Sequence, residues 1–498
     1  MPMTLKCIIV LVPMMTCVFS TSSAQDLYDE FLKQKEKEFS SFKQTKENEY
    51  EAFRRKINNE YASFLDYTWR AFNAFTGRPV PKEEPVPPVI HNKDKGKQKD
   101  KQLPIDDVIP VEPPCPQPEP ITPVEPTPTP TIDYISFSFF GTQSKVVKPT
   151  KDAGIVLNNA DERSIAASWK NVSDGRFDAM LKSCLDIRRS NKLCDWSYLL
   201  MLQQVSETYL GKGNSANLLC AWLYCQSGYK MRLANDNGNL IMLYASRHAI
   251  YNKPFWNIDG ESYYPLSDKV SKSIHICEIG FPKEQQLSLQ IGTEQNFTLN
   301  STAERFFQSK RYPDVTAKAS TNRNLIDFYN TYPTSYINND FGTRWAMYAN
   351  TPLSKEARSR FYPSLQQAIK GKSQLESVNR ILNLLQTALV YEYDNKVWGH
   401  DRAFFPDETL YYPYCDCEDR AILLSRIVRD ILGLKVVLIY YPGHLASAVN
   451  FTEAGVTGDY VLVNGQRYVI CDPTFIGAPV GATMDGMDNR QAKIILLE

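Results

Sequence analysis

The sequence predicts an α+β protein whose globular part follows a long helix and a proline-rich linker. Three observations predict this fold class. Aromatic residues recur every 11 positions over residues 26–75, and sixteen of the 31 prolines fall between Pro79 and Pro130. Beyond residue 131, helical and strand patterns alternate, and they end in one helix followed by four strands. With 498 residues the chain is too long for a single core, so several domains are expected.

Residues 1–24 are predicted to be a signal peptide. An apolar run from Cys7 to Ser20 precedes the small residues that end at Ala24, which is typical of export with cleavage after Ala24. The run is shorter than the roughly 20 residues that a membrane span requires, and no transmembrane segment is expected elsewhere. A lipoprotein anchored at Cys17 is the alternative. The predicted location is therefore the periplasm, the cell envelope or the extracellular space.

Charge and cysteine content exclude two classes of function. Lys and Arg together number 56, as do Asp and Glu, so a nucleic-acid partner is not expected. The sequence contains no CxxC motif and its five histidines are scattered, so neither a metal site nor a cofactor is predicted. An odd number of cysteines remains after the signal peptide, which leaves a free thiol or an intermolecular bridge; they are Cys115, Cys184, Cys194, Cys220, Cys225, Cys277, Cys415, Cys417 and Cys471.

Residues 25–77 are predicted to form one long amphipathic helix. Eleven residues over three turns give about 3.67 residues per turn, which keeps two aromatic columns on one face of a slightly right-handed coil. We expect this face to be buried in a homo-oligomeric coiled coil, against an envelope partner that contacts residues 26–75, or on the body of the protein. The columns are Tyr28, Phe39, Tyr50, Tyr61 and Phe72, and Phe31, Phe42, Phe53, Phe64 and Phe75.

Residues 78–131 are predicted to be an extended spacer. Prolines lack a backbone donor, so a segment this rich in them favours polyproline geometry over helices or strands. A ligand for a proline-recognition domain is the weaker alternative.

The globular part is divided into residues 132–270, an α+β domain, residues 271–350, a connecting region that contains strands, and residues 351–498, the last domain. Periodicity predicts helices at 160–169, 177–185, within 354–391 and at 418–432. It predicts strands at 134–140, 273–277, 287–291, 435–440, 446–451, 459–463 and 466–471, the last four as an antiparallel meander.

Three residues of the last domain form the predicted site. Cys417 precedes the helix, His444 follows Pro442-Gly443 and opens a strand, and Asp472 closes a strand. A helix N-terminus favours a thiolate, a histidine on a neighbouring strand can pair with it, and a carboxylate can orient the imidazole. The spacing therefore predicts an activated cysteine nucleophile.

Around these residues the sequence resembles the transglutaminase-like superfamily of papain-like cysteine enzymes. The resemblance is carried by Cys-Glu-Asp-Arg-Ala at 417–421, Gly-His-Leu-Ala-Ser-Ala-Val at 443–449 and Tyr-Val-Ile-Cys-Asp-Pro-Thr at 468–474. It implies a papain-like fold, with Cys417 as nucleophile, His444 as general base and acid, and Asp472 as orienting carboxylate. The signal type and motif style indicate an exported bacterial member. Family members often have Gly where this chain has Cys415 and an aromatic residue where it has Leu445.

An internal match predicts a degenerate tandem copy before the last domain. With a shift of 205 residues, Gly433, Gly465 and Tyr468 match Gly228, Gly260 and Tyr263. Under the same shift the three site residues fall on Lys212, Asn239 and Ser267. The first copy would then lack the triad.

The predicted function is an exported cysteine enzyme that acts on amide bonds of peptides or proteins through a thioester. Resolution by water would make it a peptidase or amidase, and resolution by an amine would make it a transglutaminase-type acyltransferase. The alternative is a non-catalytic envelope adaptor with a papain-like body on a coiled-coil stalk. A third interpretation bridges Cys417 to Cys471 in a structural disulfide. Tyr412 and Tyr414 are candidates for an oxyanion donor.

Overall fold

The computed structural model describes residues 21–81, 84–91, 99–123, 132–150, 154–267, 269–337 and 340–498, with side chains from residue 29. The chain divides into two compact units, residues 1–57 and 58–498. The fold is mixed α+β, with 36% helix, 23% strand and curled sheets. No helix in the described ranges is long and apolar enough to span a bilayer. The predicted signal peptide lies outside these ranges apart from its last four residues and stays a prediction.

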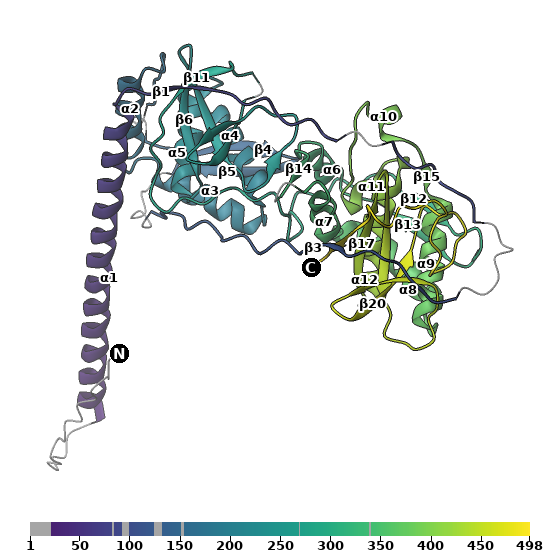
Figure 1. Cartoon of the computed structure of the whole chain (residues 1–498). Helices are drawn as coiled ribbons and strands as arrows, with labels where there is room; N and C mark the ends of the chain where they lie inside the picture. Colours follow the sequence, from purple (N-terminus) through teal and green to yellow (C-terminus); the bar gives the residue numbers. More distant parts are fainter. Residues whose placement is uncertain are drawn as a thin grey trace, which may run out of the picture. The chain divides into compact units, whose positions relative to one another are not determined.

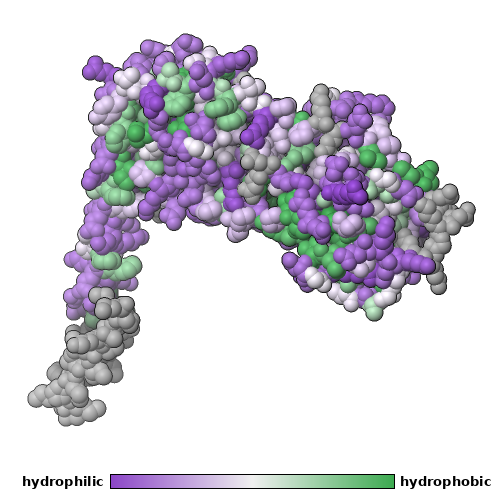
Figure 2. Space-filling view, viewed as in Figure 1, coloured by the Kyte–Doolittle hydropathy of each residue, from purple (hydrophilic) through white to green (hydrophobic). Residues whose placement is uncertain are grey.

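The predicted long helix is α1, Thr21–Leu65, and the prediction that it continues to residue 77 is wrong. Leu65 ends it because the Trp69 indole N–H donates to the Leu65 carbonyl at 3.1 Å, and the chain then enters strand β1, Arg70–Asn73. Phe72 of the aromatic repeat therefore lies in a strand. Phe31, Phe39, Phe42 and Phe53 are each more than half exposed, and Figure 2 shows apolar patches among the hydrophilic residues of this helix. Their burial by a second copy or a partner stays a prediction.

The first lobe, residues 132–276, carries a six-stranded antiparallel sheet with the order β1-β11-β6-β7-β10-β9. Figure 1 labels β1, β11 and β6 of this sheet. β1 joins its edge by pairing with β11, so a segment far upstream completes this sheet. The strands after β1 are β11 (Ser273–Ile276), β6 (Met231–Asp236), β7 (Asn239–Ala245), β10 (Glu261–Pro265) and β9 (Trp256–Ile258). The hairpin is β4 (Tyr134–Phe139) with β5 (Thr142–Val147), and the helices are α2 (Glu162–Val172), α3 (Asp178–Ser190), α4 (Asp195–Leu210) and α5 (Asn214–Gln226).

The region between the lobes contains short elements. The strand expected at 273–277 is β11, whereas 287–291 forms only an isolated bridge between Leu287 and Ser246. The short elements are β12 (Arg305–Gln308), β13 (Thr316–Ala319), α6 (Arg323–Tyr329), β14 (Ser335–Tyr336) and α7 (Thr343–Asn350). β14 pairs with β8 (Ala249–Ile250) of the first lobe.

The second lobe, residues 351–498, carries a seven-stranded sheet with the order β2-β19-β20-β18-β17-β21-β3. The predicted meander is wrong, because β20 lies between β18 and β19 instead of beyond β19. Its strands are β19 (Asp459–Val463), β20 (Gln466–Cys471), β18 (His444–Asn450), β17 (Lys435–Tyr441) and β21 (Lys493–Leu496). Around it lie α8 (Lys355–Ile369), α9 (Gln374–Ala388), α10 (Asp394–Val397), α11 (Pro406–Tyr411), α12 (Cys417–Leu432) and the pair β15 (Val390–Tyr391) with β16 (Tyr414–Cys415). Alternate sheet residues face two cores: Val436, Val449 and Val469 pack with α8, α9 and α12, whereas Val437, Ala448 and Ile470 pack on the other face.

The prediction of a free spacer over residues 78–131 is wrong for the described part of that segment. Lys101–Gln102 (β2) pairs in parallel with β19, and Asp107–Ile109 (β3) pairs in parallel with β21, so the segment closes both edges of the seven-stranded sheet. Leu103, Ile105 and Ile109 are buried. These apolar residues stand between prolines and anchor the segment on the sheet. Prolines leave the segment with few backbone N–H groups, so it adds a strand only where its remaining N–H groups meet the free carbonyls of a sheet edge.

The sheets of the two lobes share one strand order, and three of their four corresponding strand pairs share one register, the exception being β11 with β6 against β21 with β17. β11-β6-β7-β10-β9 corresponds to β21-β17-β18-β20-β19, and a helix, α5 or α12, precedes the first hairpin in each. Adding 205 to the paired residues Tyr264 and Tyr244 gives Val469 and Val449, which also pair; the pairs of β6 with β7 and of β9 with β10 shift in the same way. The register of these three pairs is the one that a tandem copy requires, and descent of the two lobes from one sequence stays a prediction.

The buried segment gives a stability prediction. Ile105→Ala removes a side chain that is 4% exposed and packs against the second-lobe sheet, so the free energy of unfolding should fall by about 2–4 kcal/mol. Asp106→Ala, at the exposed neighbouring position, is the matched control and should change it by less than about 0.5 kcal/mol. Urea unfolding measures both. Equal effects of the two substitutions would show that the segment is a free tether.

Candidate functional site

Cys417 is the first residue of α12, where the sequence predicted it. The helix starts here because the Asp419 side chain accepts hydrogen bonds from the backbone N–H groups of Asp416, at 3.2 Å, and of Phe404, at 2.8 Å. The Ile422 and Leu423 side chains in the next turn are fully buried. Carboxylates in the first turn also suit the positive end of the helix. The thiol is therefore fixed on a rigid element, with its residue 4% exposed.

His444 is the first residue of β18, immediately after the turn that joins β17 to β18. Tyr441 pairs with His444, which leaves Pro442 and Gly443 as a two-residue turn. Gly443 has a φ of 74°, a left-handed conformation that side chains oppose. The turn and the pairing fix the position of the imidazole.

Asp472 holds this imidazole. A 2.8 Å hydrogen bond joins His444 Nε2 to Asp472 Oδ2, and both residues are buried. The second carboxylate oxygen accepts from the backbone N–H groups of Thr474, at 2.8 Å, and Phe475, at 3.1 Å. Because the carboxylate accepts from Nε2, the proton of a neutral ring is on Nε2 and the lone pair is on Nδ1. The structure thus brings two of the three predicted residues into direct contact.

The third predicted residue lies against the same cavity. Cys417 and His444 both line a pocket of about 250 Å³. His444 Nδ1 is buried and has no hydrogen-bond partner among the described residues. A buried acceptor without a partner is uncommon in native proteins. The Cys417 thiol is not the partner here, because it donates to Glu418 Oε2 at 3.2 Å.

The expectation of a stabilised Cys417 thiolate is wrong in this state. Burial first, and then repulsion by the Glu418 and Asp416 carboxylates, raises the pKa of the Cys417 thiol well above its ordinary value, although a hydrogen bond from the Leu445 N–H lowers it. Burial and these two carboxylates both disfavour the thiolate that a helix N-terminus would favour. The Cys417 side chain is therefore a neutral thiol in this state.

Cys415 and Cys471 lie in the core instead. Both belong to the cluster under α9 and α12, and neither lines the cavity. Burial raises the pKa of Cys415 to about 11. The nine described cysteines are all unpaired, so a bridge from Cys417 to Cys471 is absent from this part of the chain. Of the neighbouring thiols of Cys415 and Cys417, only that of Cys417 lines the cavity.

Sequence reasoning missed Arg344, Asp394 and Asp401, which also line the cavity. The ligand atoms of Asp394, Asp401 and Glu418 lie within 4.8 Å of one another, as do those of Asp416, Cys417 and Glu418, so these residues could hold a metal ion. Arg344 already supplies positive charge, since it pairs with Asp401 and lies 3.9 Å from Glu418 Oε1. Burial and repulsion by Glu418 raise the pKa of Asp394 to about 8. No motif marks these residues; only the fold brings them together.

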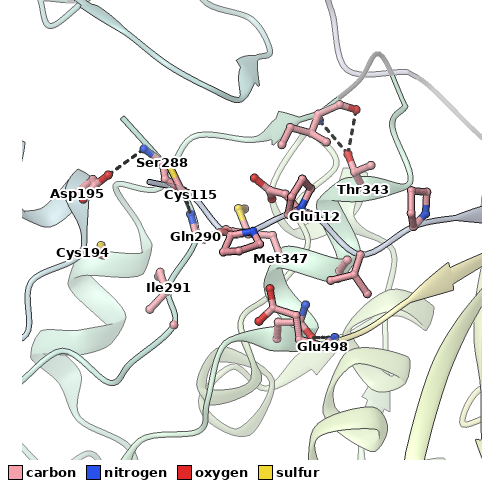
Figure 3. A pocket seen from close by; sticks show the side chains of 18 of the residues that line it. Glu112, Cys115, Cys194, Asp195, Ser288, Gln290, Ile291, Thr343, Met347 and Glu498 are labelled. Carbon is pink, nitrogen blue, oxygen red and sulfur yellow. Dashed lines mark hydrogen bonds between the residues drawn. The ribbon is translucent and has the colours of Figure 1, made fainter. Parts of the chain in front are cut away.

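A larger cavity, of about 610 Å³, lies elsewhere and contains none of the three predicted residues. Figure 3 shows Glu112 and Cys115 from the proline-rich segment facing Cys194, Asp195 and Gln290. Asp195 accepts from the Ser288 N–H at 3.0 Å. The proposed oxyanion donors Tyr412 and Tyr414 line neither cavity.

Comparison with protein-family models, curated proteins and solved structures finds no match for this chain.

The raised thiol pKa gives a pH prediction. Glu418→Gln removes the nearest repulsive carboxylate, so the thiolate should form at lower pH, and the midpoint for alkylation of Cys417 by iodoacetamide should fall by about one pH unit. Mass spectrometry in a Cys415→Ala background measures the rate against pH. Glu304→Gln, whose side chain pairs with Lys318 on the surface, should leave the midpoint in place. An unchanged or higher midpoint in Glu418→Gln would contradict the conclusion that the Glu418 carboxylate raises the pKa of the Cys417 thiol.

Proposed function

We propose that this protein is a cysteine enzyme that cleaves or transfers amide bonds of peptides or proteins. Cys417 is the nucleophile, His444 the general base and acid, and Asp472 the orienting carboxylate. The observation that carries the proposal is His444: Asp472 holds its Nε2 and its Nδ1 has no partner among the described residues, in the cavity that Cys417 lines. Such a ring is oriented for proton transfer.

The reaction begins when the Cys417 side chain rotates from Glu418 to His444 Nδ1. The thiol proton passes to Nδ1 while sulfur attacks the substrate carbonyl carbon, and the first-turn N–H groups of α12, which have no partners within the helix, can face the oxyanion. His444 then gives this proton to the amide nitrogen, the C–N bond breaks and a thioester remains. Water or a primary amine attacks the thioester, and sulfur recovers its proton through His444.

The three motifs support a transglutaminase-like, papain-like assignment for the second lobe, with the first lobe as its degenerate copy. The shared register supports the tandem arrangement. The apolar N-terminal segment supports export to the envelope or beyond, in a bacterial source.

A specific observation favours the alternative, a non-catalytic envelope adaptor. The Cys417 thiol is bonded to Glu418, its pKa is raised, and α1 exposes aromatic side chains. An adaptor needs an interaction surface and does not need a thiolate.

Amide chemistry at Cys417 can be tested directly. Wild type should release new amino termini from casein, or attach a fluorescent primary amine to it. Cys417→Ala should lose this activity entirely, and His444→Ala should lower kcat by about 10²–10⁴. Amino-group assay and in-gel fluorescence separate hydrolysis from transfer.

The matched control is Cys415→Ala, which removes a buried thiol two residues away that does not line the cavity. It should retain activity in proportion to the folded fraction. Equal loss in Cys415→Ala and Cys417→Ala would contradict the assignment, and inactivity of folded wild type on casein, peptidoglycan fragments and amine acceptors would favour the adaptor.

A further inference from the structure

Part of the wall of the Cys417 cavity comes from the proline-rich segment. Pro79, Val80, Pro81 and Pro85 line it together with Cys417 and His444. These residues lie more than 330 positions upstream of Cys417 in the sequence. The cavity that holds the nucleophile is therefore closed partly by a stretch that was expected to be a free tether.

Main-chain hydrogen bonds fix this stretch on both sides of the site. The Val86 N–H donates to the Gly443 carbonyl at 2.9 Å, directly beside His444. The His91 N–H donates to the Ile476 carbonyl at 2.9 Å, and the Ile476 N–H donates to the Val89 carbonyl at 2.8 Å, four residues after Asp472. The stretch is thus bonded to the two loops that carry the histidine and the aspartate.

The approach at Gly443 is close enough to require glycine. A Cβ built on Gly443 would lie 2.2 Å from the Glu84 carbonyl oxygen. The contacts belong to the backbone of an extended chain, and the side chains that enter the cavity are prolines and a valine. This is how extended peptides are recognised: main-chain bonds give affinity, and a chain already in polyproline geometry loses little entropy on binding.

We propose that residues 79–81 and 84–91 are an internal occupant of the substrate groove, and that the substrates are extended, proline-containing peptide segments that replace them. This inference rests on the proposed function for the chemistry, and it adds the substrate class and a closed resting state. The occupant shields Cys417, which is 4% exposed, until a peptide or a partner of the segment displaces it.

Loosening the occupant tests the closed state without any substrate. Val86→Pro removes the N–H that bonds to Gly443 and keeps the extended geometry, whereas Val86→Ala keeps that N–H. In the full-length Cys415→Ala protein at one alkaline pH, Val86→Pro should speed alkylation of Cys417 by iodoacetamide about fivefold to tenfold, the order of one lost hydrogen bond. Val86→Ala should not. Equal rates in both variants would overturn the proposal.

A peptide in trans tests the substrate class. A fluorescent peptide with the sequence of residues 79–91 should bind the Cys417→Ala, Val86→Pro protein at least about tenfold more tightly than Cys417→Ala alone, as measured by anisotropy. The same peptide with every proline replaced by alanine should lose most of this affinity. Equal binding of the two peptides, or no binding to the loosened protein, would overturn the substrate class. If binding and accessibility change as expected and casein is still not turned over, the catalytic proposal fails and the occupant stands.

Discussion

The hydrogen bond from His444 Nε2 to Asp472 Oδ2 is the constraint on which the rest of the site depends. It exists because β20 lies next to β18, so the end of one strand faces the start of the other. Gln386 of α9 fixes the loop after Asp472 by donating to the carbonyls of Asp472, at 3.0 Å, and Phe475, at 2.8 Å. Arg420, one turn after Cys417, donates to the Leu389 carbonyl at 3.0 Å. Gln386 thus holds the loop that carries Asp472, and Arg420 ties the start of α12 to the residue that follows α9.

Local patterns predicted the elements of this site well, and long-range pairing escaped them. The strands at 459–463 and 466–471 and the helix from Cys417 match the sequence pattern closely, because alternation and apolar periodicity are properties of neighbouring residues. Strand order is decided by contacts between segments that periodicity does not link. The meander would have placed β19 between His444 and Asp472, and a correct set of strands alone could not exclude it.

The misjudged features share a similar cause. Proline content could not reveal Leu103 and Ile105 as edge-strand anchors, since only the sheet supplies the free carbonyls. The thiol pKa also depends on where side chains lie: the helix N-terminus is visible in sequence, whereas burial and the direction of the Glu418 carboxylate are not. Arg344 of α7 lies beside Glu418 in the cavity although it is more than 70 residues away in the sequence, so no local pattern links the two.

The two lobes indicate what turns a shared scaffold into a site. In the first lobe the Ala160 N–H donates to the Gly238 carbonyl at 3.2 Å, and Gly238 corresponds to Gly443 under the shift of 205 residues. An extended segment therefore docks on the glycine of the first hairpin in both lobes.

In the first lobe this segment leads directly into α2, and the residue after the glycine is the exposed Asn239. In the second lobe the residue after the glycine is the buried His444, and the segment comes from the proline-rich stretch, crossing a cavity that holds a thiol. The docking contact is thus common to both lobes, whereas a buried histidine after the glycine and a covering segment from far upstream belong to the second lobe. A covering segment that is not the direct continuation of its own lobe can leave without unfolding it, which is the physical condition for a groove that a second peptide can enter.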